Sequence, residues 1–215
     1  MAKDIRWQDE YWLLLMQLYL RKPEGVKALY SRGLVDLSLE IHIPPQVLYE
    51  RMFQLRQLDT PRMERLWENY GKNPKRLAKG VKMLREMKGL GNAENFYDGV
   101  ELHESFETDF RPIAENESLT PIMLVVILDL YFRLTPNTMV KETPEIQELA
   151  KLMKIDAALV VEVMEIYQIC DPYLNRMELL TSPLVTPCYE IWKRYGNGSP
   201  EKLAAYASQL KEYFK

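Results

Sequence analysis

The chain has 215 residues, of which 47% are hydrophobic and 27% are charged, and its formal net charge is −3 at pH 7. This is the composition of an ordinary soluble protein that is long enough for one large domain or two small ones. Its two cysteines, Cys170 and Cys188, cannot form a disulfide framework, which excludes a disulfide-stabilised secreted domain and favours a reducing compartment.

The two most apolar stretches lack the features of targeting or membrane segments. Tyr11–Leu20 follows several acidic residues and has no small-residue cleavage site, so it does not resemble a signal peptide. Ile122–Leu134 is too short to span a bilayer and contains Asp129. We therefore expect a cytoplasmic protein that does not bind membranes.

Helical periodicity predicts an all-α fold, because no stretch alternates convincingly as a strand does. The first half begins with an amphipathic helix that we expect to open near Asp9. A short helix follows over Val35–Ile41, and Pro44 ends it. Pro45 suits the first turn of the next helix, which is predicted to run to about Leu58.

The first half closes with the stretch LWENYG, residues 66–71. It predicts a helix over Leu66–Tyr70 that Gly71 ends in a left-handed turn. Asn73-Pro74 is a cap followed by a first-turn proline, and it predicts a last helix that ends at Gly89 and folds back on the aromatic pair. A structural role for Trp67 and Tyr70 is favoured over a functional one.

The second half of the sequence repeats the pattern of the first. At a constant spacing of 112 residues, Leu18-Tyr19 matches Leu130-Tyr131, and Ile43 matches Ile155. The spacing grows to 125 residues where IWKRYG repeats LWENYG, so the second copy carries an insertion of about 13 residues near Pro172–Glu190, which we expect to be an irregular loop.

These matches predict an internally duplicated fold of two similar helical units packed with pseudo-twofold symmetry. The first repeat covers residues 1–88 and the second covers residues 120–215. Between them, residues 89–119 are predicted to form an acidic extended connector.

No constellation of catalytic residues is evident. The chain has two histidines, His42 and His103, and none of the common metal, nucleophile or phosphate-loop motifs. His42 lies in the turn IHIPP, and Cys170 lies on an apolar helix, where a small core residue is the simplest interpretation. We expect no enzyme activity, no metal and no cofactor.

Residues 147–166 resemble the helix-turn-helix of DNA-binding proteins. The resemblance rests on Ala150, Ile155, Val160 and Val163, with Ser38, Ile43, Leu48 and Arg51 at the matching positions of the first half. Lys154 and His42 stand where the turn glycine is usual. The resemblance implies a tandem pair of such units.

A longer pattern in each half is similar to the small helical modules that precede nuclease domains in some modification-dependent restriction enzymes. The residues that carry it are Trp7, Leu18-Tyr19, Leu37, Leu55 and Leu58-Asp59-Thr60-Pro61. This resemblance implies a recognition or docking module and no nuclease.

Charge is segregated along the chain. Residues 1–88 hold 17 Lys and Arg against 11 Asp and Glu, whereas residues 89–119 hold 1 against 8 and residues 120–215 hold 10 against 12. In the helix after Pro74, Leu77, Val81 and Leu84 share one side of a helical projection, and the lysines share the other. A basic face of this kind is either a solvated surface or a contact for nucleic-acid phosphates.

Two hypotheses follow. The first is a nucleic-acid-binding or regulatory protein whose first repeat contacts DNA or RNA. The second is a protein-interaction or scaffold module that does not bind nucleic acid. The candidate helix of the second repeat carries Asp156, Glu162 and Glu165 and no basic residue, so it should repel a duplex. The candidate nucleic-acid-binding residues are Gln46, Tyr49, Arg51, Arg56, Lys72, Lys75, Arg76, Lys79 and Lys82.

We expect the acidic connector to compete with any polyanion for the lysines of the helix after Pro74. Four carboxylates in it, Glu101, Glu104, Glu107 and Asp109, alternate with large apolar residues. The apolar residues can anchor the segment while the carboxylates face the lysines or water. We therefore expect the connector to pack against the first repeat.

Overall fold

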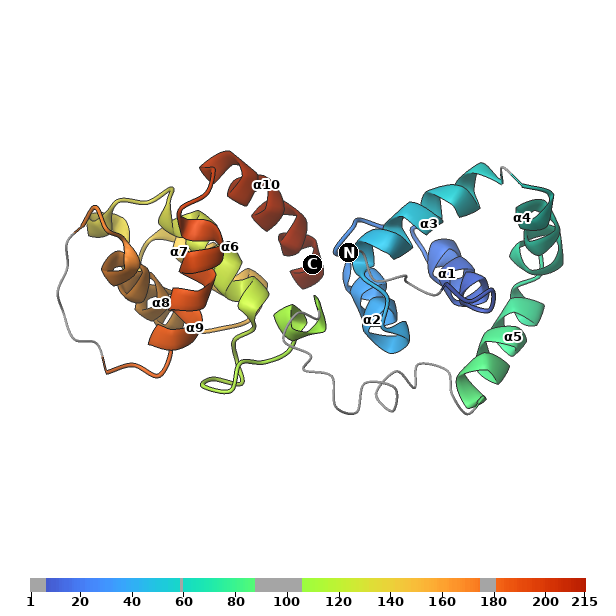
Figure 1. Cartoon of the computed structure of the whole chain (residues 1–215), viewed down its shortest axis with the longest axis horizontal. Helices are drawn as coiled ribbons and strands as arrows, with labels where there is room; N and C mark the ends of the chain where they lie inside the picture. Colours follow the sequence, from blue (N-terminus) through green and yellow to red (C-terminus); the bar gives the residue numbers. More distant parts are fainter. Residues whose placement is uncertain (1–6, 59, 88–105, 175–180) are drawn as a thin grey trace. The chain divides into compact units, whose positions relative to one another are not determined.

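The computed structural model describes residues 7–58, 60–87, 106–174 and 181–215, and Figure 1 shows how its helices follow one another. Within these ranges the protein is all-helical, with ten α-helices and no strand. The chain divides into two compact units, residues 1–102 and residues 103–215. The predicted all-α class is confirmed.

The first unit is a bundle of α-helices that ends in a π-helical turn and one more helix. Its elements are α1 (Tyr11–Leu20), α2 (Arg32–Ile41), α3 (Pro45–Gln57), α4 (Pro61–Leu66), the π-helix η1 (Trp67–Gly71) and α5 (Pro74–Glu86). The expected course of α3 is confirmed almost to the residue. Asn73 caps α5 as expected, because its side chain accepts a hydrogen bond from the Arg76 amide.

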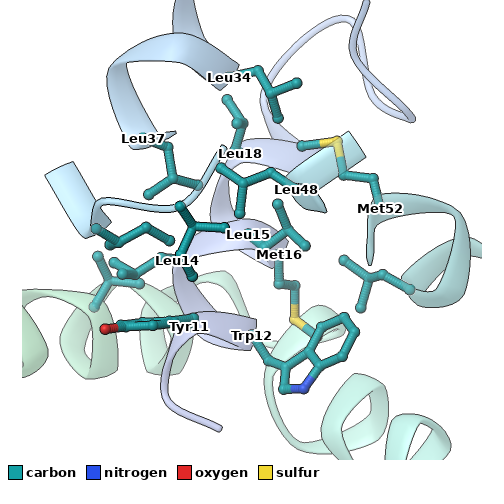
Figure 2. Close-up of a cluster of buried hydrophobic side chains, with 14 of the residues drawn as sticks. Tyr11, Trp12, Leu14, Leu15, Met16, Leu18, Leu34, Leu37, Leu48 and Met52 are labelled. Carbon is teal, nitrogen blue, oxygen red and sulfur yellow. The ribbon is translucent and has the colours of Figure 1, made fainter. Parts of the chain in front are cut away.

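Helix α1 is the centre of the first unit. It contacts α2, α3, α5 and η1, and none of its ten residues is exposed. Figure 2 shows its side chains projecting in several directions into the surrounding apolar cluster, with Leu15 and Met16 fully buried. The expected amphipathic helix is therefore wrong: apart from Gln17, α1 is apolar on every side, as suits a helix enclosed by other helices.

The second unit has a similar succession of helices. Its elements are η3 (a 3-10 helix, Phe106–Phe110), α6 (Pro121–Tyr131), η4 (a 3-10 turn, Pro136–Thr138), α7 (Pro144–Met153), α8 (Ala157–Cys170), α9 (Val185–Ile191), the π-helix η5 (Trp192–Gly196), α10 (Pro200–Leu210) and η6 (a 3-10 turn, Lys211–Phe214).

Helix α6 occupies the centre of the second unit. It contacts α7, α8, α9, α10, η3 and η5, and nine of its eleven residues are buried. Its charged residue Asp129 is 5% exposed, and a buried carboxylate requires partners. Arg133 Nη2 lies 2.9 Å and Lys211 Nζ 3.6 Å from Asp129 Oδ2. Asp129 thus ties the last turn of the chain to the core helix.

Two pairs of helices, α2 with α3 and α7 with α8, are each joined by a tight turn whose central residue has a left-handed backbone conformation. His42 follows α2 with a φ of 55°, and Lys154 follows α7 with a φ of 59°. In each turn the amide of the next residue donates to a carbonyl five positions back, Ile43 to Ser38 at 3.1 Å and Ile155 to Ala150 at 3.0 Å. This is the Schellman motif, which usually places glycine at the left-handed position.

The π-helical turns explain why each aromatic motif ends in glycine. Neither Gly71 nor Gly196 has a positive φ, so the predicted left-handed turn is wrong. A Cβ on Gly71 would instead lie 2.8 Å from Trp67 Cδ2, and one on Gly196 would lie 2.6 Å from Trp192 Cδ2. Each glycine is required because the indole of its own motif lies flat against its Cα.

Several predicted boundaries differ from those observed. The helix expected at Leu66 begins five residues earlier at Pro61, where the Thr60 side chain accepts a hydrogen bond from the Met63 amide. Helix α5 ends at Glu86, before Gly89, which lies outside the described residues. The predicted insertion is not a loop throughout, because α9 begins within it at Val185.

Part of the predicted connector is folded into the second unit. Phe106–Phe110 is a 3-10 helix that contacts α6, and Phe110 and Leu119 are buried. Arg111 pairs with Glu107 at 3.2 Å, and Arg194 pairs with Asp109 at 3.1 Å. These carboxylates are thus held by arginines of their own unit. Residues 88–105 lie outside the described residues, so Glu101 and Glu104 remain untested.

Among the described helices, none is both long and apolar enough to cross a membrane.

Replacing Gly71 or Gly196 by alanine should lower the free energy of unfolding by about 1–3 kcal/mol, because the new methyl group must displace a packed indole. Chemical denaturation monitored by circular dichroism would measure the loss. Gly80 is the matched control: it lies within α5, and a Cβ there would make ordinary contacts at 3.5 Å to Leu13 and 3.6 Å to Tyr70. Gly80→Ala should stabilise the first unit by roughly 0.5–1 kcal/mol. Equal effects at all three glycines would contradict the proposed indole clash.

Replacing His42 or Lys154 by glycine should stabilise the protein by about 1 kcal/mol, since the left-handed conformation carries a steric cost for residues with a Cβ. The shift of the denaturation midpoint is the measurement. Lys151→Gly is the control because Lys151 lies in the last turn of α7. There the same lysine-to-glycine change should destabilise by about 1 kcal/mol, and stabilisation by both changes would contradict the explanation.

Candidate functional site

A cluster of exposed positive charge in the first unit lies on α5 and the turn before it. Its five cations are all exposed: Lys72, Lys75, Arg76, Lys79 and Lys82. We call this cluster the basic face. The sequence predicted all five as site residues. The structure places four of them on α5 and Lys72 in the turn before it, with the apolar side of α5 turned toward the core.

The orientation of the basic face is set by the opposite side of α5. Leu77, Val81 and Leu84 are buried, and α5 packs against α1 and η1. At the far end, Arg85 forms two hydrogen bonds with Glu40 of α2, of 2.7 and 2.9 Å. That carboxylate hydrogen bond raises the pKa of Arg85. These contacts prevent α5 from rotating, so its lysines remain in solvent.

The five cations differ in how far their charge is neutralised. Lys72 is paired with Glu68 at 2.5 Å, and Lys82 approaches Glu86 at 3.7 Å. Lys75, Arg76 and Lys79 have no carboxylate within ion-pairing distance among the described residues. Exposed ion pairs contribute only about 0–1 kcal/mol, so a polyanion could displace both glutamates at small cost.

Tyr70 supports the middle of the basic face. The guanidinium of Arg76 lies over its ring, 5.0 Å from the centroid. This cation–π contact holds Arg76 on the surface with its hydrogen-bond donors in solvent. Sequence reasoning treated Tyr70 as structural only, and it missed both this contact and the pairing of Arg85. The residues concerned are six and 45 positions apart, spacings that carry no helical signal.

The four predicted contacts on α3 are placed differently. The Gln46 amide nitrogen donates to the Tyr30 hydroxyl at 2.6 Å, and Tyr49 packs edge-to-face on Phe53 at 5.0 Å. Arg51 lies over the rings of Trp7 and Trp12, at 5.2 and 5.8 Å.

Of the same four residues, Gln46 and Arg56 are exposed. Most of the predicted base-reading groups on α3 are thus engaged within the first unit and would have to leave their partners to reach a ligand. The basic face needs no such rearrangement.

The matching helix of the second unit offers no basic surface. In α8, Glu165 is exposed and Glu162 accepts a hydrogen bond from Ser182 at 2.8 Å. Asp156 caps the helix by accepting from the Ala158 amide at 2.9 Å. An acidic helix repels phosphate, so the asymmetry predicted between the two halves is present in their surfaces.

The nucleophilic side chains lie in unfavourable environments. Cys188 is fully buried, and burial raises the pKa of its thiol to about 12. Burial also raises the pKa of the Cys170 thiol. Among the described residues, no group of three or more His, Cys, Asp or Glu is arranged to hold a metal ion.

The chain matches no family model, and no curated protein or solved structure matches it either. Its function must therefore be inferred from the geometry of the chain itself.

The thiol of Cys188 should be inert in the folded protein. Because the thiolate is the reacting species, a pKa of about 12 in place of the ordinary 9.0 leaves about a thousand-fold less thiolate at pH 8. Iodoacetamide labelling followed by mass spectrometry should show Cys188 unmodified in the native protein and fully modified in denaturant. Rapid labelling in the native protein would return Cys188 to consideration as a nucleophile.

Proposed function

We propose that this protein binds nucleic acid through the basic face of the first unit, in a regulatory role that requires no catalysis. The observation that carries the proposal is the exposure of five cations on α5 and the turn before it, with Lys75, Arg76 and Lys79 lacking carboxylate partners among the described residues. Such a row of cations is suited to the regularly spaced phosphates of a nucleic-acid backbone, whose counterions it would release.

The proposed contact is with the backbone rather than with the bases. Lysines bind phosphate as point charges and carry no sequence information. Arg76 is the one guanidinium of the basic face, and its position on Tyr70 leaves it able to bind a phosphate. Gln46 is exposed but hydrogen-bonded to Tyr30, and Arg51 is half-buried over two tryptophans. These contacts argue against α3 as the primary reading helix.

We also infer that the two units arose by duplication of one helical module with a helix-turn-helix-like pair. Helices α2 and α7 begin and end 112 residues apart, and so do the left-handed residues His42 and Lys154. The π-helices η1 and η5 begin and end 125 residues apart, each with an indole against its final glycine. Coincidence of such uncommon backbone features supports common descent of the units. Their pseudo-twofold packing stays a prediction.

A protein partner is the second candidate, and one observation favours it. Met83 and Met87 are 58% and 60% exposed on or next to α5, beside the lysines. Exposed methionines adapt to irregular apolar partners. An acidic amphipathic segment of another protein could use both the methionines and the lysines.

Changing Lys75, Lys79 and Lys82 together to glutamate should abolish binding of mixed-sequence DNA at low salt. Fluorescence anisotropy of a labelled duplex is the measurement. In the unaltered protein, the logarithm of affinity should fall with the logarithm of salt concentration with a slope of about −0.9 for each phosphate contacted. If these three lysines each contact a phosphate, the slope of the unaltered protein should correspond to at least three contacts.

The matched control places the same charge change on exposed lysines of the second unit, Lys141, Lys151 and Lys193. If net charge alone governed binding, both triple variants would lose affinity equally, and the assignment to the basic face would be wrong. If the unaltered protein binds neither DNA nor RNA at low salt, nucleic-acid binding is excluded. A pull-down that depends on Met83 and Met87 then becomes the test of the second candidate.

A further inference from the structure

A shallow pocket in the second unit lies between η5 and the start of α10. Its volume is about 330 Å³, at the lower end of the range of about 300–1,000 Å³ for small-ligand sites. The pocket is lined by two tyrosines, Tyr195 and Tyr206, by two cations, Arg194 and Lys202, and by Leu203 and Ser199. Sequence reasoning missed it, because Tyr195 and Tyr206 are brought together only when α10 folds back on η5.

The tyrosines form an aromatic surface. Their ring centroids are 5.8 Å apart and their planes are inclined by 31°. This separation leaves no room for a third ring between them, and the Arg194 guanidinium lies over the Tyr195 ring, 5.2 Å from its centroid. A planar ligand would therefore stack on the outer face of Tyr206. Base–aromatic stacking of that kind is tolerant of sequence, since every base has a π face.

The cations at the pocket differ in availability. Arg194 is bound by Asp109 through two hydrogen bonds of 3.1 and 3.3 Å, and it also donates to the Tyr195 hydroxyl at 3.2 Å. Lys202 is exposed and has no carboxylate at ion-pairing distance among the described residues. Lys202 is therefore the group ready to bind an anion, and Arg194 becomes available only if Asp109 releases it.

The start of α10 does not itself supply the anion site. Ser199 caps the helix by accepting a hydrogen bond from the Lys202 amide at 3.3 Å, and its hydroxyl donates to Glu201 at 2.5 Å. The Ser199 hydrogen bond is the main cause of the lowered pKa of Glu201. With the cap satisfied, recognition depends on the side chains of Lys202, Tyr195 and Tyr206.

We propose that this pocket binds one nucleotide of a single-stranded nucleic acid, with the base stacked on the tyrosines and the adjoining phosphate on Lys202. A planar ring and a negative charge on one ligand are what an aromatic surface beside an exposed lysine selects. This site lies in a different unit from the basic face and does not depend on it. It would add a contact for unpaired strands to a protein that otherwise binds phosphates through its first unit.

The test uses the full chain carrying the glutamate changes at Lys75, Lys79 and Lys82, so that the basic face contributes nothing. The probe is a short fluorescein-labelled oligodeoxyadenylate, and its anisotropy reports binding. Tyr206→Leu should weaken binding about ten-fold, the loss expected for one stacked base, whereas Tyr206→Phe should retain it. Comparing leucine with phenylalanine separates stacking from general damage to the fold.

Two further variants test the cations, and one tests specificity. Lys202→Gln should weaken binding several-fold and reduce its salt dependence, whereas Asp109→Asn should strengthen binding by freeing Arg194. Tyr189→Leu removes a tyrosine of α9 that is 58% exposed and does not line the pocket, so it should change nothing.

Equal affinity of the Tyr206→Leu and Tyr206→Phe chains for the oligonucleotide would overturn the proposal. This outcome is independent of whether the first unit binds duplex DNA. Competition by AMP at the same nucleotide concentration as the oligonucleotide would assign the pocket to a free nucleotide and overturn its assignment to a strand. Failure of duplex binding by the unaltered chain would refute only the role of the basic face.

Discussion

The enclosure of one apolar helix is the constraint on which each unit depends. Helix α1 has no exposed residue, and α6 buries nine of its eleven. Such a helix is stable in water only when other helices cover every side of it. In the first unit this requirement brings α5 back onto α1, with Leu77, Val81 and Leu84 inward. The lysines of α5 face solvent because its apolar residues occupy the side that packs against α1.

The π-helical turns direct the returning helices. At η1 and η5 the indole lies against the Cα of the last glycine, and a tyrosine of the same turn is left facing the helix that follows. In the first unit that tyrosine supports Arg76, and in the second it stacks with Tyr206. The same packing device thus positions a cationic surface in one unit and an aromatic pocket in the other.

The pairing of charges differs between the two units. In the second unit Arg133 and Lys211 share Asp129, and Arg194 is held by Asp109. Partly buried pairs of this kind are costly to separate, since breaking them leaves a carboxylate without a partner. In the first unit the cations of the basic face are exposed, and the pairs they form are weak. This difference is why the proposed function assigns polyanion binding to the first unit, while the second unit offers Lys202 beside its tyrosines.

The sequence by itself determined the helices with strong local signals. Proline in the first turn and a capping side chain located α3 and the start of α5, and the 3.6-residue period separated the lysines of α5 from its core side. The Thr60-Pro61 start of α4 carried the same signal and could have been found. Only the tertiary structure decided that α1 is enclosed and that the glycines serve indole packing. It also decided that, among the described residues, Gln46 and Arg51 have partners while Lys75 and Lys79 have no carboxylate at ion-pairing distance. Those outcomes depend on contacts between residues far apart in the chain, and local propensity carries no information about them.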